Sequence, residues 1–237
     1  MATLDFVTLV VAHRTCPRDC LENSIAGIRI AARLGADVVE VDARRSRDGT
    51  PVLIHDPWLG RVQHVPWPVK WSCDSLLSRL RVPTLTAALE AARSVGLRVA
   101  IDAKDAGAAG AVLASVRETG ALQHVLLWSQ HMSTARAFAR AVPEADVGLF
   151  RDTFDDAGHA RLLADANAIG AQAVSVHQDA VTSSFLASAR RRGLDVYCGY
   201  QTVEVQAARL AAAAVAGLTG VVTDWPDQAR AILSACG

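Results

Sequence analysis

The sequence predicts an α/β fold, a (β/α)₈ TIM barrel, and three observations support this prediction. A short unit recurs along the 237 residues: an Ala-rich amphipathic stretch, then a glycine, then a mostly apolar run rich in valine. This unit is typical of a helix, its left-handed cap and a buried parallel strand. Eight such strands can be placed, which favours a closed barrel. No glycine-rich dinucleotide motif follows the first strand, which disfavours the alternative of an open doubly wound sheet.

The first strand is expected at residues 7–12, which form an uninterrupted apolar run. A helix then extends to Leu34, and Asn23 or Ser24 can cap its N-terminus; we favour Asn23. Gly35 ends this helix, and residues 37–42 form the second strand. A strand-like hairpin that ends in His55-Asp56 follows.

The later strands are expected at residues 98–102, 124–128, 145–150, 173–176, 195–198 and 221–223. A glycine stands just before five of them, at Gly96, Gly120, Gly170, Gly193 and Gly220. Such glycines are typical of left-handed helix caps, so helices should alternate with these strands in parallel βαβ units.

A longer segment separates the second strand from the third. Their starts are about 60 residues apart, against roughly 22 to 30 elsewhere, which indicates an insertion at residues 57–82. This segment contains three tryptophans and three prolines and shows no clean periodicity over most of its length. We expect a single domain, 1–237, with a short, irregular, cap-like insertion over the barrel mouth. Alternatively, the tryptophans fill a local satellite core.

Composition limits the classes of partner. Apolar residues make up 51% of the chain, enough for a large core, and Lys plus Arg equals Asp plus Glu at 24 each. This balance disfavours nucleic acid and anionic membranes and favours a small-molecule partner. The apolar run near the N-terminus is too short to span a bilayer, and five cysteines without a secretion signal indicate a cytoplasmic protein. The sequence does not indicate the oligomeric state.

Polar residues interrupt the apolar strands at their carboxyl ends, where the catalytic groups of such barrels lie. Glu40 and Asp42 end the second strand and point to the same side, and Asp102 ends the third. Buried together, these acids would repel one another unless a cation neutralised them. They form a plausible oxygen-ligand set for Mg²⁺ or Ca²⁺. Alternatively, they pair with Arg14, Arg44 or Lys104 in a structural ion network.

Two histidines stand beside these acids. His13 follows the first strand and His55 follows the hairpin. A pair of side chains that titrate near neutrality suits general acid and general base roles. His177 and Asp224, after the sixth and eighth strands, are also expected at the barrel mouth.

These residues belong to a series of motifs with characteristic order and spacing: His13-Arg14, Glu22-Asn23, Gly35-Ala36-Asp37, Glu40-x-Asp42, Asp48-Gly49-x-Pro51-Val52 and His55-Asp56. The series resembles the N-terminal signature of the glycerophosphodiester phosphodiesterases. Residues 82–85, 101–104 and 220–226 are similar to later segments of that family, so the resemblance spans nearly the whole chain.

The resemblance implies a role for each matching position. It implies metal ligands at Glu40, Asp42 and Asp102, an acid/base pair at His13 and His55, and substrate or phosphate contacts at Arg14, Lys104 and Glu22. The implied cofactor is a divalent metal, Mg²⁺ or Ca²⁺, with Mn²⁺ possible. The implied reaction is hydrolysis of a glycerophosphodiester or related small phosphodiester to a phosphomonoester and an alcohol.

Several positions depart from the family pattern. Thr15 stands where the family usually has Gly, Leu21 where it has Pro, and Asp102 where it has Glu. The insertion is shorter than usual, and residues 198–201 replace an aromatic-Thr-Val-Asn pattern. We therefore expect a rebuilt pocket for the alcohol portion of the substrate.

Three other functions use the same residues. A substrate hydroxyl could attack in place of water and release a cyclic phosphate. Lys104 could form a Schiff base with a carbonyl substrate, although that chemistry needs no acidic triad. The barrel could also bind a phosphoryl ligand without turnover.

Overall fold

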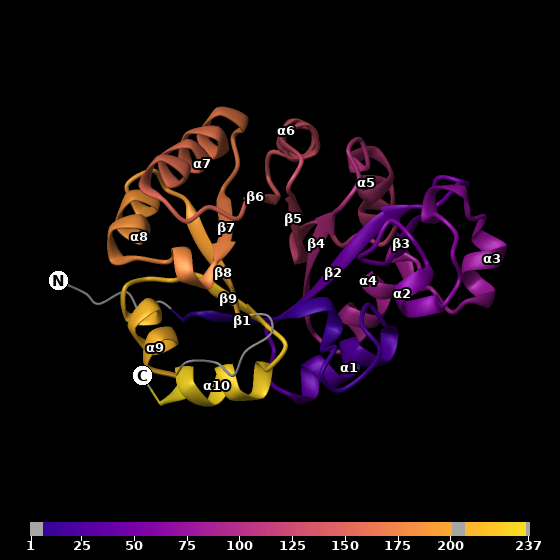
Figure 1. Ribbon diagram of the computed structural model, residues 1–237, viewed down its shortest axis with the longest axis horizontal. Coiled ribbons are helices and arrows are strands. Elements are labelled where there is room, and N and C mark those ends of the chain that lie inside the picture. The colour runs from indigo at the N-terminus through magenta and orange to yellow at the C-terminus, as the bar shows by residue number, and fades with distance from the viewer. Residues whose placement is uncertain (1–6, 201–206, 236–237) are drawn as a thin grey trace.

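A computed structural model describes residues 7–200 and 207–235 and confirms the predicted barrel (Figure 1). Eight parallel strands form a ring that closes because β1 pairs with both β2 and β9. The ring strands are β1 (Leu9–Ala12), β2 (Val38–Arg45), β4 (Arg98–Ala103), β5 (Val125–Ser129), β6 (Asp146–Phe150), β7 (Ala173–His177), β8 (Asp195–Tyr200) and β9 (Gly220–Thr223). A ninth strand, β3 (Pro51–Leu53), pairs antiparallel with β2 outside the ring, as expected for the hairpin before His55.

Helices surround the ring (Figure 1). They are α1 (Ile25–Arg33), α4 (Leu85–Ser94), α5 (Ala109–Glu118), α6 (Met132–Ala141), α7 (Asp156–Ile169), α8 (Ser183–Arg190), α9 (Ala207–Val215) and α10 (Pro226–Ser234). Their apolar faces and the outward side chains of the strands form the main core. Within the described ranges, no helix has both the length and the apolar character needed to cross a bilayer.

A smaller core fills the interior of the barrel. It includes Val38 and Ala100, which lie two residues before Glu40 and Asp102 on their strands. Trp128 and Tyr197 meet there edge to face, with ring centroids 5.0 Å apart. Because side chains alternate along a strand, the acids of β2 and β4 point into the same interior, above this apolar floor.

Most of the predicted glycine caps are confirmed by backbone torsion. Gly35, Gly96, Gly120, Gly170 and Gly193 all have positive φ angles. The prediction for Gly220 is wrong, because this residue is the first of β9 and Gly217, at φ 93°, takes the left-handed conformation instead.

The N-terminal cap of α1 is Ser24 and not Asn23. The Ser24 hydroxyl accepts a hydrogen bond from the Gly27 N–H at 3.1 Å. Asn23 turns away from the helix, with φ 53°, and bonds to Asp42 instead. The preference for Asn23 as the cap is therefore wrong, because a buried carboxylate competes for its amide.

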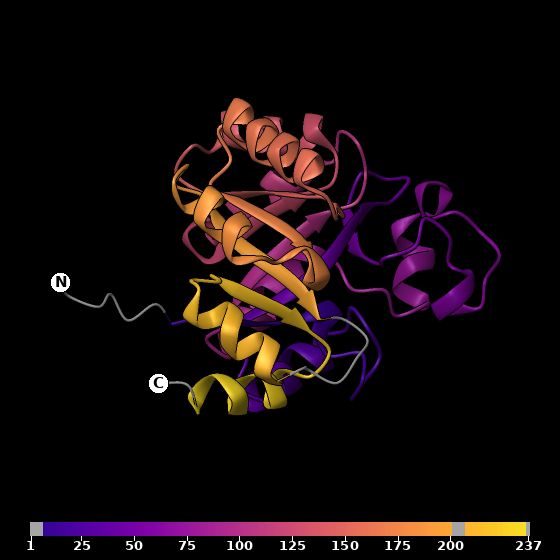
Figure 2. The ribbon, with the colours of Figure 1, turned by 60° about the vertical axis from the view of Figure 1, so that its left-hand side comes forward.

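The insertion projects beyond the carboxyl ends of the ring strands, at one side of the mouth (Figure 2). It contains α2 (Gly60–Gln63), a short 3₁₀ turn (Val69–Trp71) and α3 (Asp74–Arg79). A satellite core does form there, but its residues are aliphatic: Val52, Ile54, Leu59, Val69, Leu77 and Val82. Trp58, Trp67 and Trp71 are 54%, 47% and 54% exposed. The alternative in which the tryptophans fill this core is therefore wrong.

Candidate active site

A cavity of about 230 Å³ opens at the carboxyl ends of the strands. Its lining includes seven of the eight predicted site residues: His13, Arg14, Glu40, Asp42, His55, Asp102 and Lys104. The eighth, Glu22, does not line the cavity. The topology explains the convergence, because the carboxyl ends of parallel ring strands all meet at one face of a barrel.

A left-handed turn after β1 aims Arg14 at the acids. Arg14, Thr15 and Cys16 have φ angles of 41°, 63° and 69°. This turn directs the Arg14 N–H to the Oε2 atom of Glu40, at 2.7 Å. Thr15 takes a conformation that favours glycine, which explains the usual family residue at this position. Its hydroxyl accepts a hydrogen bond from the Ser24 N–H at 3.0 Å, which partly offsets the strain.

The three predicted metal ligands converge. Asp42 lies directly beside Asp102 in the register of β2 and β4. Glu40 lies two residues before Asp42, so both side chains are on the same face of β2. One oxygen from each carboxylate lies within 4.8 Å of the others, and all three residues are buried. The Asn23 amide donates to Asp42 Oδ2 at 2.7 Å, and the Asp42 N–H donates back to Asn23 Oδ1 at 2.9 Å.

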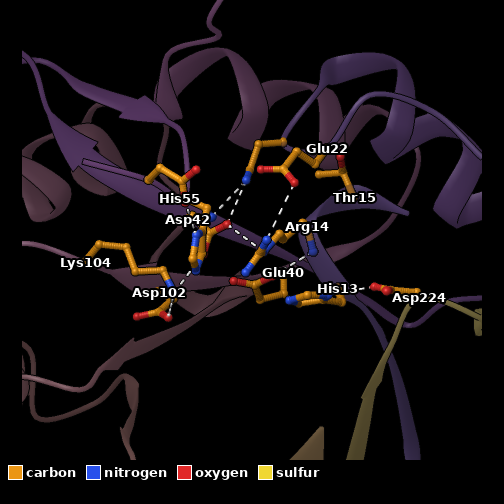
Figure 3. A network of polar contacts seen from close by, with 12 residues as sticks. His13, Arg14, Thr15, Glu22, Glu40, Asp42, His55, Asp102, Lys104 and Asp224 are labelled. Carbon is orange, nitrogen blue, oxygen red and sulfur yellow. Dashed lines mark hydrogen bonds and ion pairs between the residues drawn. The ribbon is translucent and has the colours of Figure 1, made fainter. Parts of the chain in front are cut away.

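Cationic side chains also reach this cluster, as the ion-network alternative expected. The Lys104 ammonium lies 2.9 Å from Asp42 Oδ1 and 2.5 Å from Asp102 Oδ2, and Arg14 Nε lies 3.4 Å from Asp42 Oδ2 (Figure 3). Arg44 does not join them and pairs with Asp105 at 2.6 Å. The network leaves Asp102 Oδ1 buried without a hydrogen-bond donor among the described residues.

The acids differ in electrostatic state. Burial, together with the charge of Asp42, raises the pKa of Glu40 to about 7. Burial also raises the pKa of Asp102, although Lys104 opposes this. Burial acts on Asp42 too, but the charges of Lys104 and Arg14 outweigh it and hold the pKa of Asp42 below its usual range. An all-oxygen donor set with an unpaired buried oxygen fits a hard divalent cation.

Each histidine is held by a carboxylate, and Figure 3 shows the contact between His13 and Asp224. His13 Nδ1 lies 2.6 Å from Asp224 Oδ1, so the residue after β9 orients the residue after β1 across the closure of the barrel. His55 Nδ1 lies 2.7 Å from Asp56 Oδ1. A carboxylate at Nδ1 fixes the orientation of the imidazole ring. The predicted place of Asp224 at the mouth is thus refined to a contact with His13.

Sequence reasoning missed Arg61, which lies on α2 of the insertion. Its Nε donates to Asp56 Oδ2 at 2.6 Å, and its two terminal nitrogens donate to the Glu22 carboxylate at 2.8 and 2.7 Å. Burial opposes ionisation of Asp56, but the hydrogen bonds from Arg61 and His55 lower its pKa to about 2. Arg61 therefore ties the insertion to the loop after β1 and fixes the carboxylate that holds His55.

The family model of the Glycerophosphoryl diester phosphodiesterase family matches residues 13–228. The chain belongs to this family. A glycerophosphodiester phosphodiesterase from Caldanaerobacter subterraneus subsp. tengcongensis is 27% identical over 160 residues, which cover 60% of this chain and 66% of that protein, just under two thirds of its length.

Solved structures of the family share the fold. A glycerophosphodiester phosphodiesterase from Agrobacterium tumefaciens superposes with a TM-score of 0.78 at 25% identity, covering 94% of this chain and 99% of that one. A phosphodiesterase from Oleispira antarctica, solved with the product sn-glycerol-3-phosphate, has a TM-score of 0.81 at 20% identity and covers 97% and 98%.

In this glycerophosphodiester phosphodiesterase family member, the far wall of the cavity includes Gly199, which belongs to the altered motif at residues 198–201. The wall is formed by β5 to β8 and the residues that follow β5 and β6, and it includes Gln130, Phe150, Asp152, Ser175, His177 and Gly199. The predicted place of His177 at the mouth is confirmed. Gly199 lines the cavity without a side chain, whereas the neighbouring Cys198 is fully buried. Gln201, the last residue of the altered motif, lies outside the described residues.

Proposed function

We propose that this chain is a metal-dependent phosphodiesterase that hydrolyses a glycerophosphodiester or related small phosphodiester to a phosphomonoester and an alcohol. One observation supports this most directly: three buried carboxylates within 4.8 Å of one another share a cavity with two histidines, each held by an aspartate. Membership of the family agrees with the proposal.

Glu40, Asp42 and Asp102 would hold the metal, and Mg²⁺, Ca²⁺ and Mn²⁺ all suit such oxygen ligands. A bound divalent ion would stabilise negative charge on the phosphoryl group and on the attacking oxygen. Lys104 and Arg14 line the same cavity and supply further positive charge for the phosphoryl oxygens.

The histidines handle the protons. Because a carboxylate engages Nδ1 of each ring, Nε2 is the nitrogen that faces the substrate. One ring accepts a proton from the attacking water, and the other donates a proton to the leaving alkoxide, as in-line displacement requires. Glu22 pairs with Arg61 and Arg14 and thereby helps to position these two side chains. A direct contact between Glu22 and the substrate stays a prediction.

The test is hydrolysis of glycerophosphocholine by the purified chain. Activity should stop with a chelator and return with Mg²⁺, Ca²⁺ or Mn²⁺. His13→Ala and His55→Ala should each lower the rate by about 10²- to 10⁴-fold. His64→Ala is the matched control, because His64 does not line the cavity. Full activity of the His13 variant, or activity in the presence of the chelator, would contradict the proposal.

Phosphorus NMR of the product separates hydrolysis from cyclisation. A monoester supports water as the nucleophile, whereas a cyclic phosphate supports attack by a substrate hydroxyl. Turnover of either kind would exclude a barrel that only binds a phosphoryl ligand.

A cytoplasmic location also stays a prediction. The four cysteines within the described residues, Cys16, Cys20, Cys73 and Cys198, form no disulfide, as expected in a reducing compartment. Cys236 lies outside the described residues.

A further inference from the structure

A second cavity, also of about 230 Å³, lies beside the catalytic one, where the insertion meets the ends of β2 and β4. We call it the insertion groove. It includes Pro57, two residues after His55, and Asp105, the residue after Lys104. Arg44, another lining residue, donates from Nε to the His55 carbonyl at 2.8 Å. The groove therefore adjoins the segment that carries His55 and the end of β4, which Lys104 follows.

The groove has a net positive charge. Arg44 is neutralised by Asp105, with 2.6 Å between NH1 and Oδ1. Two further lining cations, Arg45 and Lys70, are exposed, and neither forms an ion pair with a carboxylate in the part of the chain that the structure describes. Unpaired cations around a concave surface attract an anionic group.

The groove also has exposed aromatic walls. Trp58 and Trp71 both line it, and each is 54% exposed. Large exposed apolar side chains gathered at a cavity are typical of ligand contacts. Aromatic walls could instead favour a quaternary ammonium group through cation–π contact. However, the Lys70 ammonium already lies 5.4 Å from the centroid of the Trp71 ring, so a cation of the protein occupies that position.

We propose that the insertion groove receives one alcohol portion of the substrate and selects an alcohol that bears a second anionic group, such as a phosphate ester. This inference rests on the proposed phosphodiesterase function and narrows its substrate class. The tryptophans contact the body of the alcohol, Lys70 and Arg45 pair with its negative charge, and a cationic alcohol such as choline is repelled.

The test compares three diesters that share glycerol and differ in charge: glycerophosphocholine, glycerophosphoinositol and glycerophosphoinositol 4-phosphate. At low ionic strength kcat/KM should be highest for the phosphorylated inositol diester. Lys70→Glu and Arg45→Glu should each lower that value by roughly 3- to 10-fold and raise kcat/KM for glycerophosphocholine, because a cation that repels choline is replaced by an anion. Arg79→Glu is the matched control, because Arg79 lies on the same insertion but does not line the groove. Because the substrates are compared within one preparation of each variant, a partial loss of folded protein does not change the ratio of their kcat/KM values.

A binding measurement separates failure of this proposal from failure of the proposed function. Tryptophan fluorescence of the His13→Ala variant with Mg²⁺ is titrated with the same three diesters. The phosphorylated diester should bind more tightly than the other two, and the His13→Ala/Lys70→Glu double variant should lose this preference. That result supports the proposed role of the groove even if the wild-type chain hydrolyses none of the three diesters. Equal affinities, a preference for glycerophosphocholine, or an equal effect of Lys70→Glu on all three would overturn it.

Discussion

Replacing Glu40 by Gln should stabilise the metal-free chain at alkaline pH, although it removes a metal ligand. The pKa of Glu40 rises from its ordinary value of 4.5 to about 7 in the fold, because of burial and the charge of Asp42. The folded chain therefore holds more protons than the unfolded chain between these values, and its stability falls as the pH rises from 4.5 to 7. Above pH 7 the full penalty of the buried carboxylate remains.

The size of this penalty follows from the shift. Each pKa unit corresponds to about 1.4 kcal/mol, so the raised pKa of Glu40 lowers the free energy of unfolding by about 3 kcal/mol at pH 8. Gln is neutral and similar in shape, and its carbonyl oxygen can still accept the hydrogen bond from the Arg14 N–H. For a chain of this length, 3 kcal/mol corresponds to a rise of about 6 to 12 °C in Tm.

The assay is thermal unfolding of the wild type and Glu40→Gln in chelator, at pH 5 and pH 8. The variant should melt higher at pH 8 and nearly equal to the wild type at pH 5. With Mg²⁺ added the order should reverse, because only the wild type keeps all three carboxylates and gains stability from binding. Glu90→Gln, at an exposed position of α4, should show neither effect. A Glu40→Gln variant that melts lower than the wild type in chelator at pH 8 would refute this reasoning.

Two further predictions concern single contacts. Arg61→Ala should lower kcat by at least about 10-fold with little change in KM, because it frees the carboxylate of Asp56 that holds His55. Added guanidinium should restore part of the rate. A loss that guanidinium does not restore would indicate a structural role only. Ser24→Ala should cost about 1 kcal/mol in urea unfolding because Ser24 caps α1, and an unchanged midpoint would contradict the assigned cap.

The fold was predictable because its signals are local. Strands buried on both faces appear as apolar runs, and helices that end before a left-handed glycine such as Gly35 show where each unit stops. Such signals fix boundaries less well: the pattern predicts a left-handed conformation at Gly220, whereas Gly217 adopts it three residues earlier. The insertion lacked periodicity, and sequence alone could not tell whether its tryptophans or its aliphatic residues fill the satellite core.

The site was predictable to the extent that topology decides it. Residues at the carboxyl ends of barrel strands must meet, which brings Asp42 beside Asp102 whatever the loops do. The barrel topology does not predict the contact between Arg61 and Glu22, because Glu22 lies 39 positions away in the sequence and only the path of the insertion brings the two together. Asn23 was ambiguous for a different reason: its amide can cap a helix or bond a buried acid, and only the position of Asp42 decides.

Crystals grown with Mn²⁺ and measured at an anomalous wavelength test the central claim most directly. The account predicts one strong anomalous peak in the catalytic cavity, within about 2.6 Å of an oxygen from each of Glu40, Asp42 and Asp102. A peak held by other residues, or Lys104 remaining paired with Asp42 and Asp102 at saturating Mn²⁺ with no peak between them, would contradict it.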